Sequence, residues 1–333
     1  MNEFVYSSTG LQLFATLKAD DAIEIPMLRK CLFIIPFLLL QTAVAARPEV
    51  KGGFFRTTDG VRLHYLEAGV GPGILFEPGW TMPAWIWDAQ LRHFAEHYHI
   101  VALDPRSQGD SDKCSDGNYP ERRAQDINEL VKHLKLSPVV LVGWSLGVNE
   151  LLTYAELFGG SEVRAYVLVD GFASDKQDAK FIASVLALYK QVQTDRRKFT
   201  EKFVRSMYKK PQPEDYLARV VAASMKMPTD TAIALSVLTI TRADWRPAIA
   251  RLDRPVLITC ETALKGPAAD LIKSMVPSTR VELFDDAGHA LFVDDATRFN
   301  AVLEDFLQHL APQESKPGSG RNRARSSGRA LTR

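Results

Sequence analysis

The sequence predicts an α/β domain in which helices flank a mostly parallel sheet, and two observations support this fold class. Short runs rich in β-branched and aromatic residues alternate with longer stretches of helical periodicity, a pattern typical of strand–helix–strand crossovers. The 333 residues are 46% hydrophobic and 24% charged, with a formal net charge of +1. This length suffices for one large core and an inserted subdomain, and the near-neutral charge argues against nucleic acid as the main partner.

Eight runs are expected to form the strands of this sheet: 53–58, 61–69, 73–78, 99–104, 139–144, 165–170, 255–260 and 280–285. The first two lie close enough in sequence for a hairpin, and the others need crossover connections. Helical patterns occupy the intervals at 85–97, 120–134, 148–158 and 296–310.

The interval between Asp170 and Pro255 contains no run typical of a strand and has the periodicity of several amphipathic helices. We expect these helices to form a cap, inserted after the sixth strand. Apolar residues such as Leu188, Phe199 and Phe203 are expected to pack within the cap rather than to contact substrate. The predicted division is a first core segment at 47–171, a cap at 172–250 and a second core segment at 251–311.

The two ends of the chain differ from the rest in composition. From residue 27 a short basic start precedes an apolar run and then Ala43-Val44-Ala45, the three zones of a secretory signal peptide over 27–46. We therefore expect a secreted or periplasmic protein; the apolar run is too short for a stable membrane span, although an uncleaved anchor is the alternative. Residues 1–26 do not fit this arrangement and are interpreted as a non-native upstream extension. Residues 312–333, rich in Gly, Ser and Arg, are expected to form a disordered basic tail.

A serine lies between two glycines immediately after the apolar run at 139–144, in the sequence GWSLG. The G-x-S-x-G pattern alone is only suggestive, but here a helical stretch follows it directly. Small residues at Gly143 and Gly147 allow a sharp strand-to-helix turn that exposes the hydroxyl at the carboxyl edge of the sheet. We therefore predict that Ser145 is a catalytic nucleophile, which needs a nearby base because a serine hydroxyl is a weak nucleophile.

Of the seven histidines, His289 alone follows a predicted strand in a glycine-containing turn, and we predict that it is the base. A tetrahedral oxyanion also needs N–H donors. The loop after the third strand, Glu77-Pro78-Gly79-Trp80, lies beside the serine turn if both strands are central. The backbone N–H groups of Trp80 and Leu146 are therefore the predicted oxyanion hole.

With EAGVGPG, PGW, ALDPRSQGDSD, GWSLG and DAGHALFVDD in this order, the chain resembles the α/β-hydrolase superfamily over about residues 52–310. It is most similar to the esterase and cofactor-free haloperoxidase-like branch. The resemblance implies an eight-stranded sheet, a lid after the sixth strand and hydrolysis through an acyl-enzyme, with no cofactor and no metal. Two departures stand out: Pro78-Gly79 replaces the frequent His-Gly of the oxyanion loop, and the usual Gly-x-x-Asp after the seventh strand is missing.

The missing aspartate matters because a histidine base needs a carboxylate on its other ring nitrogen. Asp170 ends the sixth predicted strand, 25 residues after Ser145. Lipases and haloalkane dehalogenases of the superfamily place their acid after that strand, and this spacing resembles theirs. Asp170 is therefore the predicted acid, with a turn-capping role as the alternative for this residue. Glu261, just beyond the seventh strand, is the alternative acid.

Two other motifs are given structural interpretations. The H-x-x-E-H pattern at His93–His97 matches a zinc motif but lies at a helix end with no evident third ligand, so we expect a solvated helix face. The charges of Asp104–Asp110 are expected to brace a loop.

Cys114 and Cys260 are expected to remain separate rather than to form a disulfide.

The sequence thus predicts a serine hydrolase that cleaves small carboxylic esters. Lactone hydrolysis or perhydrolysis would use the same groups. A rival from another class is a ligand-binding protein that kept the fold but lost catalysis, supported by the missing acid after the seventh strand. A nucleophilic aspartate, as in related dehalogenases and epoxide hydrolases, is disfavoured because the turn carries serine.

Overall fold

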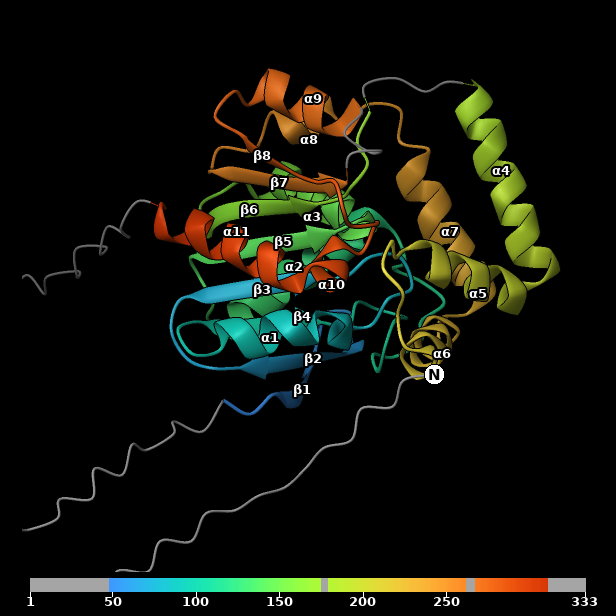
Figure 1. Cartoon of the computed structure of the whole chain (residues 1–333), viewed down its shortest axis with the longest axis horizontal. Helices are drawn as coiled ribbons and strands as arrows, with labels where there is room; N and C mark the ends of the chain where they lie inside the picture. The colour runs from blue at the N-terminus through green and yellow to red at the C-terminus, as the bar shows by residue number, and fades with distance from the viewer. Residues whose placement is uncertain (1–47, 175–178, 262–266, 311–333) are drawn as a thin grey trace, which may run out of the picture. The chain divides into compact units, whose positions relative to one another are not determined.

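The computed structural model describes residues 48–174, 179–261 and 267–310. The predicted signal peptide, the segment upstream of it and the basic tail lie outside these ranges. An eight-stranded sheet forms the centre of the described domain (Figure 1). Its strands are β1 (Lys51–Arg56), β2 (Arg62–Ala68), β3 (Gly73–Glu77), β4 (His99–Leu103), β5 (Val139–Trp144), β6 (Val163–Val169), β7 (Val256–Glu261) and β8 (Arg280–Phe284).

The strands lie in the order β1-β2-β4-β3-β5-β6-β7-β8. β1 and β2 form the predicted antiparallel hairpin, β2 is also antiparallel to β4, and every later neighbour is parallel. The eight-stranded, mostly parallel sheet is therefore confirmed. β3 and β5 are central neighbours, with Glu77 opposite Gly143, so the loop after β3 and the serine turn after β5 meet at one edge.

Helices cover both faces of the sheet, which explains why its central strands are apolar without alternation. All five residues of β3 are buried; Ile74 and Phe76 belong to the hydrophobic core on one face and Leu75 to the core on the other. One face carries α1 (Asp88–Phe94), α10 (Leu291–Asp294) and α11 (Ala296–Gln308). The opposite face carries α2 (Pro120–His133), α3 (Leu146–Phe158), α8 (Arg246–Ile249) and α9 (Pro267–Met275).

The chain leaves the sheet after β6 and builds the insertion predicted from the sequence. The cap consists of α4 (Ala179–Thr194), α5 (Arg196–Ser206), α6 (Glu214–Ser224) and α7 (Thr229–Ile240), which lie together beyond one end of the sheet in Figure 1. The last helix of the insertion, α8, packs against the core through Ala248 and Ile249. A helical insertion after the sixth strand is therefore confirmed.

The structure differs from the sequence prediction in some helices. Residues 85–97 form a 3₁₀ turn, η1 (Ala84–Trp87), followed by the shorter α1. Both α9 and the one-turn α10 were not predicted, because helices of nine and four residues give too few turns for a clear periodicity. Cys114 and Cys260 form no disulfide, as expected. None of the helices in the described ranges has the length and apolarity needed to cross a bilayer.

Candidate active site

Ser145 lies on a strained turn between β5 and α3. Its backbone has φ 57° and ψ −117°, a conformation that a non-glycine residue rarely adopts. A Cβ on Gly143 would come within 2.7 Å of the Gly147 carbonyl oxygen, and a Cβ on Gly147 within 2.8 Å of the Glu77 carbonyl oxygen. The two glycines of the motif are therefore required by close backbone contacts, and they hold the strained turn in place.

The structure brings Ser145, His289 and Asp170 into one hydrogen-bonded series. Ser145 Oγ lies 2.8 Å from His289 Nε2, and His289 Nδ1 lies 2.6 Å from Asp170 Oδ2. A carboxylate can only accept, so Nδ1 carries the proton and the Nε2 lone pair faces the serine hydroxyl. These three residues come from the ends of β5, β6 and β8, which meet at the carboxyl edge of the sheet.

Asp170, not Glu261, contacts the histidine. The Asp170 side chain has no exposed surface, and its second oxygen accepts a 3.0 Å hydrogen bond from the Glu261 backbone N–H. Asp170 also has a positive φ of 47°, which turns the chain sharply away from β6. The Glu261 carboxyl is half-buried, and burial together with the nearby Asp170 raises its pKa. The alternative acid therefore supplies a backbone donor to Asp170 rather than a partner for His289.

The loop that carries His289 is fixed by residues that the sequence reasoning did not identify. Trp144, the last residue of β5, donates from its indole nitrogen to the His289 carbonyl oxygen at 2.8 Å. Asp294 accepts from the Gly288 backbone N–H at 2.8 Å. On the cap side, the Met207 carbonyl oxygen accepts from the Ala290 N–H at 2.8 Å. The Trp144 and Met207 contacts join segments far apart in the sequence, so no local pattern could have revealed them.

The predicted oxyanion-hole residues lie beside the serine. A Cβ on Gly79 would come within 3.0 Å of Ser145 Cβ, so the loop after β3 passes directly against the nucleophile. Trp80, Ser145 and Leu146 all line the same cavity. Within the described ranges, neither the Trp80 nor the Leu146 N–H has a protein acceptor, which leaves both donors available for a developing oxyanion.

Gln108 clamps the oxyanion loop from the core side. Its amide nitrogen donates to the carbonyl oxygens of Gly79 at 3.1 Å and Met82 at 2.8 Å. Its amide oxygen accepts from the Thr81 N–H at 3.2 Å and from Arg123 at 2.9 Å. A buried side chain that satisfies four partners at once restricts the path of this loop, and with it the direction of the Trp80 N–H.

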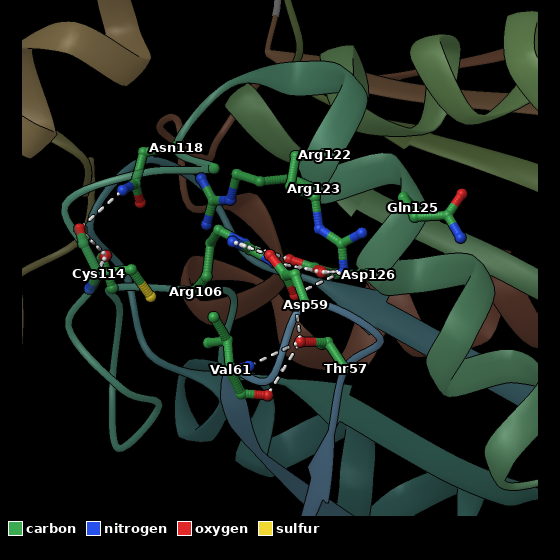
Figure 2. A network of polar contacts seen from close by, with 12 residues as sticks. Thr57, Asp59, Val61, Arg106, Cys114, Asn118, Arg122, Arg123, Gln125 and Asp126 are labelled. Atoms are coloured by element: carbon green, nitrogen blue, oxygen red, sulfur yellow. Dashed lines mark hydrogen bonds and ion pairs between the residues drawn. The ribbon is translucent and has the colours of Figure 1, made fainter.

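A buried ionic network supports the segment that carries Gln108. Figure 2 shows the Arg106 guanidinium between two carboxylates, Asp126 at 2.6 Å and Asp59 at 3.0 Å. Although burial acts in the opposite direction, the hydrogen bond and charge of Arg106 lower the pKa of Asp59 to about 2. Arg123 in turn pairs with Glu150 of α3 at 2.8 Å, which ties the segment to the helix that follows the nucleophile. The charges around Asp104–Asp110 therefore brace a loop, as expected.

Glu77, at the end of β3, is a fully buried carboxyl directly beneath the serine turn. A Cβ on Gly147 would lie 3.2 Å from Glu77 Cγ. Burial and the adjacent Glu150 carboxylate raise the pKa of Glu77 well above its usual range. Burial raises the pKa of Glu150 as well, although Arg123 opposes this effect. Glu77, whose pKa rises further, is the carboxyl of this pair that resists ionisation more strongly.

A cavity of about 1120 Å³ opens above Ser145, between the sheet edge and the cap. Its walls include Leu188 of α4 and Phe199 and Phe203 of α5. Phe199 and Phe203 pack against buried residues of the cap, as expected, and they border the cavity as well. The two phenylalanines do pack against each other, with ring centroids 6.0 Å apart, but the same face of α5 borders the cavity. The spacing of Phe199 and Phe203 in the sequence places both on one face of α5, but it does not indicate what this face contacts.

His64, Asp104 and Asp110 form a group of possible metal ligands among the described residues. This group does not include the H-x-x-E-H residues His93–His97. His64 Nδ1 is already bonded to Asp104 at 2.7 Å, and the Lys226 ammonium lies 2.6 Å from Asp110. The lysine charge opposes cation binding there. His93 lies 3.7 Å from Glu304 on the outer helical layer.

Comparison with known proteins agrees with this geometry. The sequence pattern of the Alpha/beta hydrolase family matches residues 74–302. The chain is 33% identical over 117 residues to a non-heme haloperoxidase from Rhodococcus erythropolis, and 33% identical over 120 residues to a bifunctional esterase/perhydrolase from Acinetobacter calcoaceticus. Each match spans 35% of this chain and less than half of the relative, 43% and 44%. A solved esterase from Exiguobacterium antarcticum has the same fold, with a TM-score of 0.72 at 24% identity over 78% of this chain and 100% of that one.

Proposed function

Because the chain belongs to the alpha/beta hydrolase family, we propose that it is a serine hydrolase that cleaves carboxylic esters of small molecules. The observation that carries this proposal is the hydrogen-bonded series from Ser145 through His289 to Asp170, open to a cavity large enough for a small ester.

The geometry supports a two-step acyl transfer. In the first step Ser145 Oγ attacks the ester carbonyl while His289 Nε2 accepts the hydroxyl proton, and Asp170 stabilises the resulting imidazolium. The Trp80 and Leu146 N–H groups receive the oxyanion, and the imidazolium protonates the leaving alcohol. In the second step His289 takes a proton from water, which attacks the acyl-enzyme and releases the acid.

A panel of p-nitrophenyl esters with acyl chains of increasing length tests this proposal. We expect saturable hydrolysis by the wild-type protein for at least part of the series, because the cavity walls are apolar and accommodate a chain. The Ser145→Ala variant is the control, and its release of p-nitrophenol should match the uncatalysed rate. Equal rates for wild type and Ser145→Ala across the panel would leave the non-catalytic, ligand-binding alternative.

Perhydrolysis is a second candidate reaction of the same site. The similarity to a bifunctional esterase/perhydrolase and to a non-heme haloperoxidase favours it. In this reaction hydrogen peroxide replaces water in the second step and the acyl group leaves as a peracid. Incubation with a short carboxylic acid and peroxide, with peracid detected by halide oxidation, separates this activity from ester hydrolysis; a lactone substrate tests the remaining alternative.

We further propose that the protein acts outside the cytoplasm, in the periplasm or the surrounding medium. This proposal rests on the basic, apolar and Ala-x-Ala zones of residues 27–46. Intact mass of protein recovered from a secreting host should correspond to a chain that begins at Ala46 or Arg47. A product that retains residues 27–45 would replace secretion with membrane anchoring.

A further inference from the structure

The helical insertion after β6 concentrates positive charge in a chain whose formal net charge is close to zero. From α4 to α8, residues 179–249 contain thirteen Lys and Arg and six Asp and Glu, a formal charge of +7. The whole chain carries only +1. The insertion is therefore strongly positive, whereas the remaining residues together carry a net negative formal charge.

Three lysines of the cap border the cavity itself. Lys190 lies near the end of α4, and Lys198 and Lys202 lie one turn apart on α5, on the side that also carries Phe199. All three are exposed, and none forms an ion pair with another residue in the ranges that the structure describes. Long lysine side chains can rest on apolar walls while their ammonium groups remain at the rim.

The acidic residue of the cap that borders this cavity does not offset the lysines. Asp195 is the N-cap of α5, and its Oδ1 accepts from the Lys198 backbone N–H at 3.0 Å. Its carboxylate is therefore used at a helix N-terminus, where the helix dipole stabilises a negative charge. The lining of the cap retains a net positive charge.

A fourth cation, Arg196, is buried behind the cavity wall without a carboxylate partner in the described part of the chain. The residue is 9% exposed, and its guanidinium carbon lies 5.2 Å from the centroid of the Trp80 ring. One nitrogen donates to the Ser224 carbonyl oxygen at 3.3 Å, while Nε and Nη1 have no hydrogen-bond partner. Buried charges are normally paired, so this uncompensated cation adds positive potential on the same side as the three lysines.

We propose that this cavity selects esters that carry a second, anionic group at the end away from the scissile bond, with Lys190, Lys198 and Lys202 as the anion-binding residues. This inference rests on the proposed ester hydrolysis. The apolar wall formed by residues such as Leu188 and Phe203 receives the aliphatic chain between the two groups. The chemical class is therefore the monoester of a dicarboxylic acid, or an ester with a comparable anionic terminus.

Binding to the inactive Ser145→Ala protein tests this selectivity without any chemical step. Calorimetric titration with ethyl monoesters of glutaric, adipic and suberic acid is compared with titration of the matched ω-carboxamides, which have nearly the same size and no charge. Exposed ion pairs each contribute little, so three lysines should favour the carboxylate by about tenfold in Kd at the best chain length. This preference should fall toward unity in 0.5 M NaCl, where the Debye length is only a few Å.

The decisive variant combines Lys190→Gln, Lys198→Gln and Lys202→Gln in the Ser145→Ala background. Exposed lysines can be replaced without loss of packing, and circular dichroism and thermal unfolding verify the fold. We expect the triple variant to bind carboxylate and carboxamide equally. The matched control replaces Lys51, Lys132 and Lys273, which are exposed and do not border the cavity, and should keep the preference.

Equal affinities for each carboxylate and its carboxamide in the Ser145→Ala protein would overturn the inference. So would a preference that survives the cavity triple variant, or no saturable binding of any carboxylate. The proposed function fails on a different result, namely absence of hydrolysis of neutral p-nitrophenyl esters by the wild-type protein. The binding preference and the catalytic activity are therefore tested independently.

Discussion

At the carboxyl edge of the sheet, the groups of the site are buried and held by specific partners, whereas the cap side of the same cavity presents exposed and mostly unpaired side chains. Asp170 has no exposed side-chain surface and both its oxygens accept hydrogen bonds. On the cap side, Leu188 is 37% exposed, and the three lysines that border the cavity are exposed. One wall of the cavity is fixed and the other is open to solvent.

This difference separates two tasks. Proton transfer and oxyanion stabilisation require groups positioned within fractions of an ångström, which buried hydrogen bonds provide. Recognition of a flexible substrate requires complementary charge and apolar surface, for which exposed side chains suffice. Changes at the sheet edge should therefore lower kcat, and changes on the cap should alter substrate affinity.

The largest effect is expected from the nucleophile and the base. Ser145→Ala and His289→Ala should each lower kcat by about 10⁴-fold or more without unfolding the protein, because neither side chain supports the fold. The residues act as a unit, so the double variant should be little worse than either single one. Steady-state kinetics measures this, and an additive loss in the double variant would show that the two residues act separately.

Asp170 and Glu261 give the next contrast. Asp170→Asn should lower kcat by up to about 10⁴-fold, because an amide at this position favours the wrong tautomer of His289. Glu261→Gln is the matched control and should stay near wild type, since Glu261 contributes its backbone N–H rather than its carboxyl. A large loss of kcat in Glu261→Gln with little change in Asp170→Asn would instead identify Glu261, at the end of β7, as the acid.

A smaller effect on the same wall is expected from Gln108, a positioning residue for the oxyanion loop. Gln108→Met keeps the size of the side chain but removes the donors to Gly79 and Met82. A slightly displaced Trp80 N–H should lower kcat by about 10- to 100-fold with a smaller change in KM. Gln308→Met, the same chemical change at an exposed position of α11, serves as control. A Gln108→Met protein that folds normally and turns over like wild type would exclude the clamp.

The smallest effect concerns pH and stability beneath the nucleophile. Burial and the neighbouring Glu150 raise the pKa of Glu77 well above its ordinary value of 4.5. The folded state therefore keeps a proton that the unfolded state loses above this pH. Unfolding free energy should fall as pH rises above 4.5 toward the folded pKa, by up to about 1.4 kcal/mol per pH unit.

The Glu77→Gln variant has no ionisable group at this position. Its stability curve, compared with that of wild type, therefore isolates the contribution of Glu77. Chemical denaturation of both proteins between pH 5 and 9 should show a smaller loss of unfolding free energy for Glu77→Gln than for wild type. Parallel stability curves over this range would mean that Glu77 is ionised in the folded protein.

The sequence predicted which side chains meet at the carboxyl edge of the sheet because the patterns that identify them are local. The serine turn follows an apolar strand and contains two glycines, and Asp170 ends a strand that lies beside it. What the sequence could not reveal depends on contacts between distant segments: the Gln108 hydrogen bonds, the Trp144–His289 hydrogen bond and the burial of Arg196 against Trp80.

The cap was predicted as an insertion of helices, but the role of its side chains was not. An amphipathic period shows which residues share a face and does not show whether that face meets another helix or a cavity. For Phe199 and Phe203 both are true, and only the tertiary structure reveals it. For Gln108 the sequence shows only a polar residue in the loop after β4, within ALDPRSQGDSD, and not which backbone groups it bonds.

The central claim is that Ser145 is the residue that becomes acylated, and covalent labelling tests it most directly. Folded wild-type protein is treated with a fluorophosphonate, and the modified site is located by peptide mass spectrometry. We predict a single phosphonyl adduct on the peptide that contains Ser145, absent from Ser145→Ala and formed far more slowly by His289→Ala. A folded wild-type protein that stays unlabelled, or that is labelled at another residue with equal efficiency in Ser145→Ala, would contradict the account.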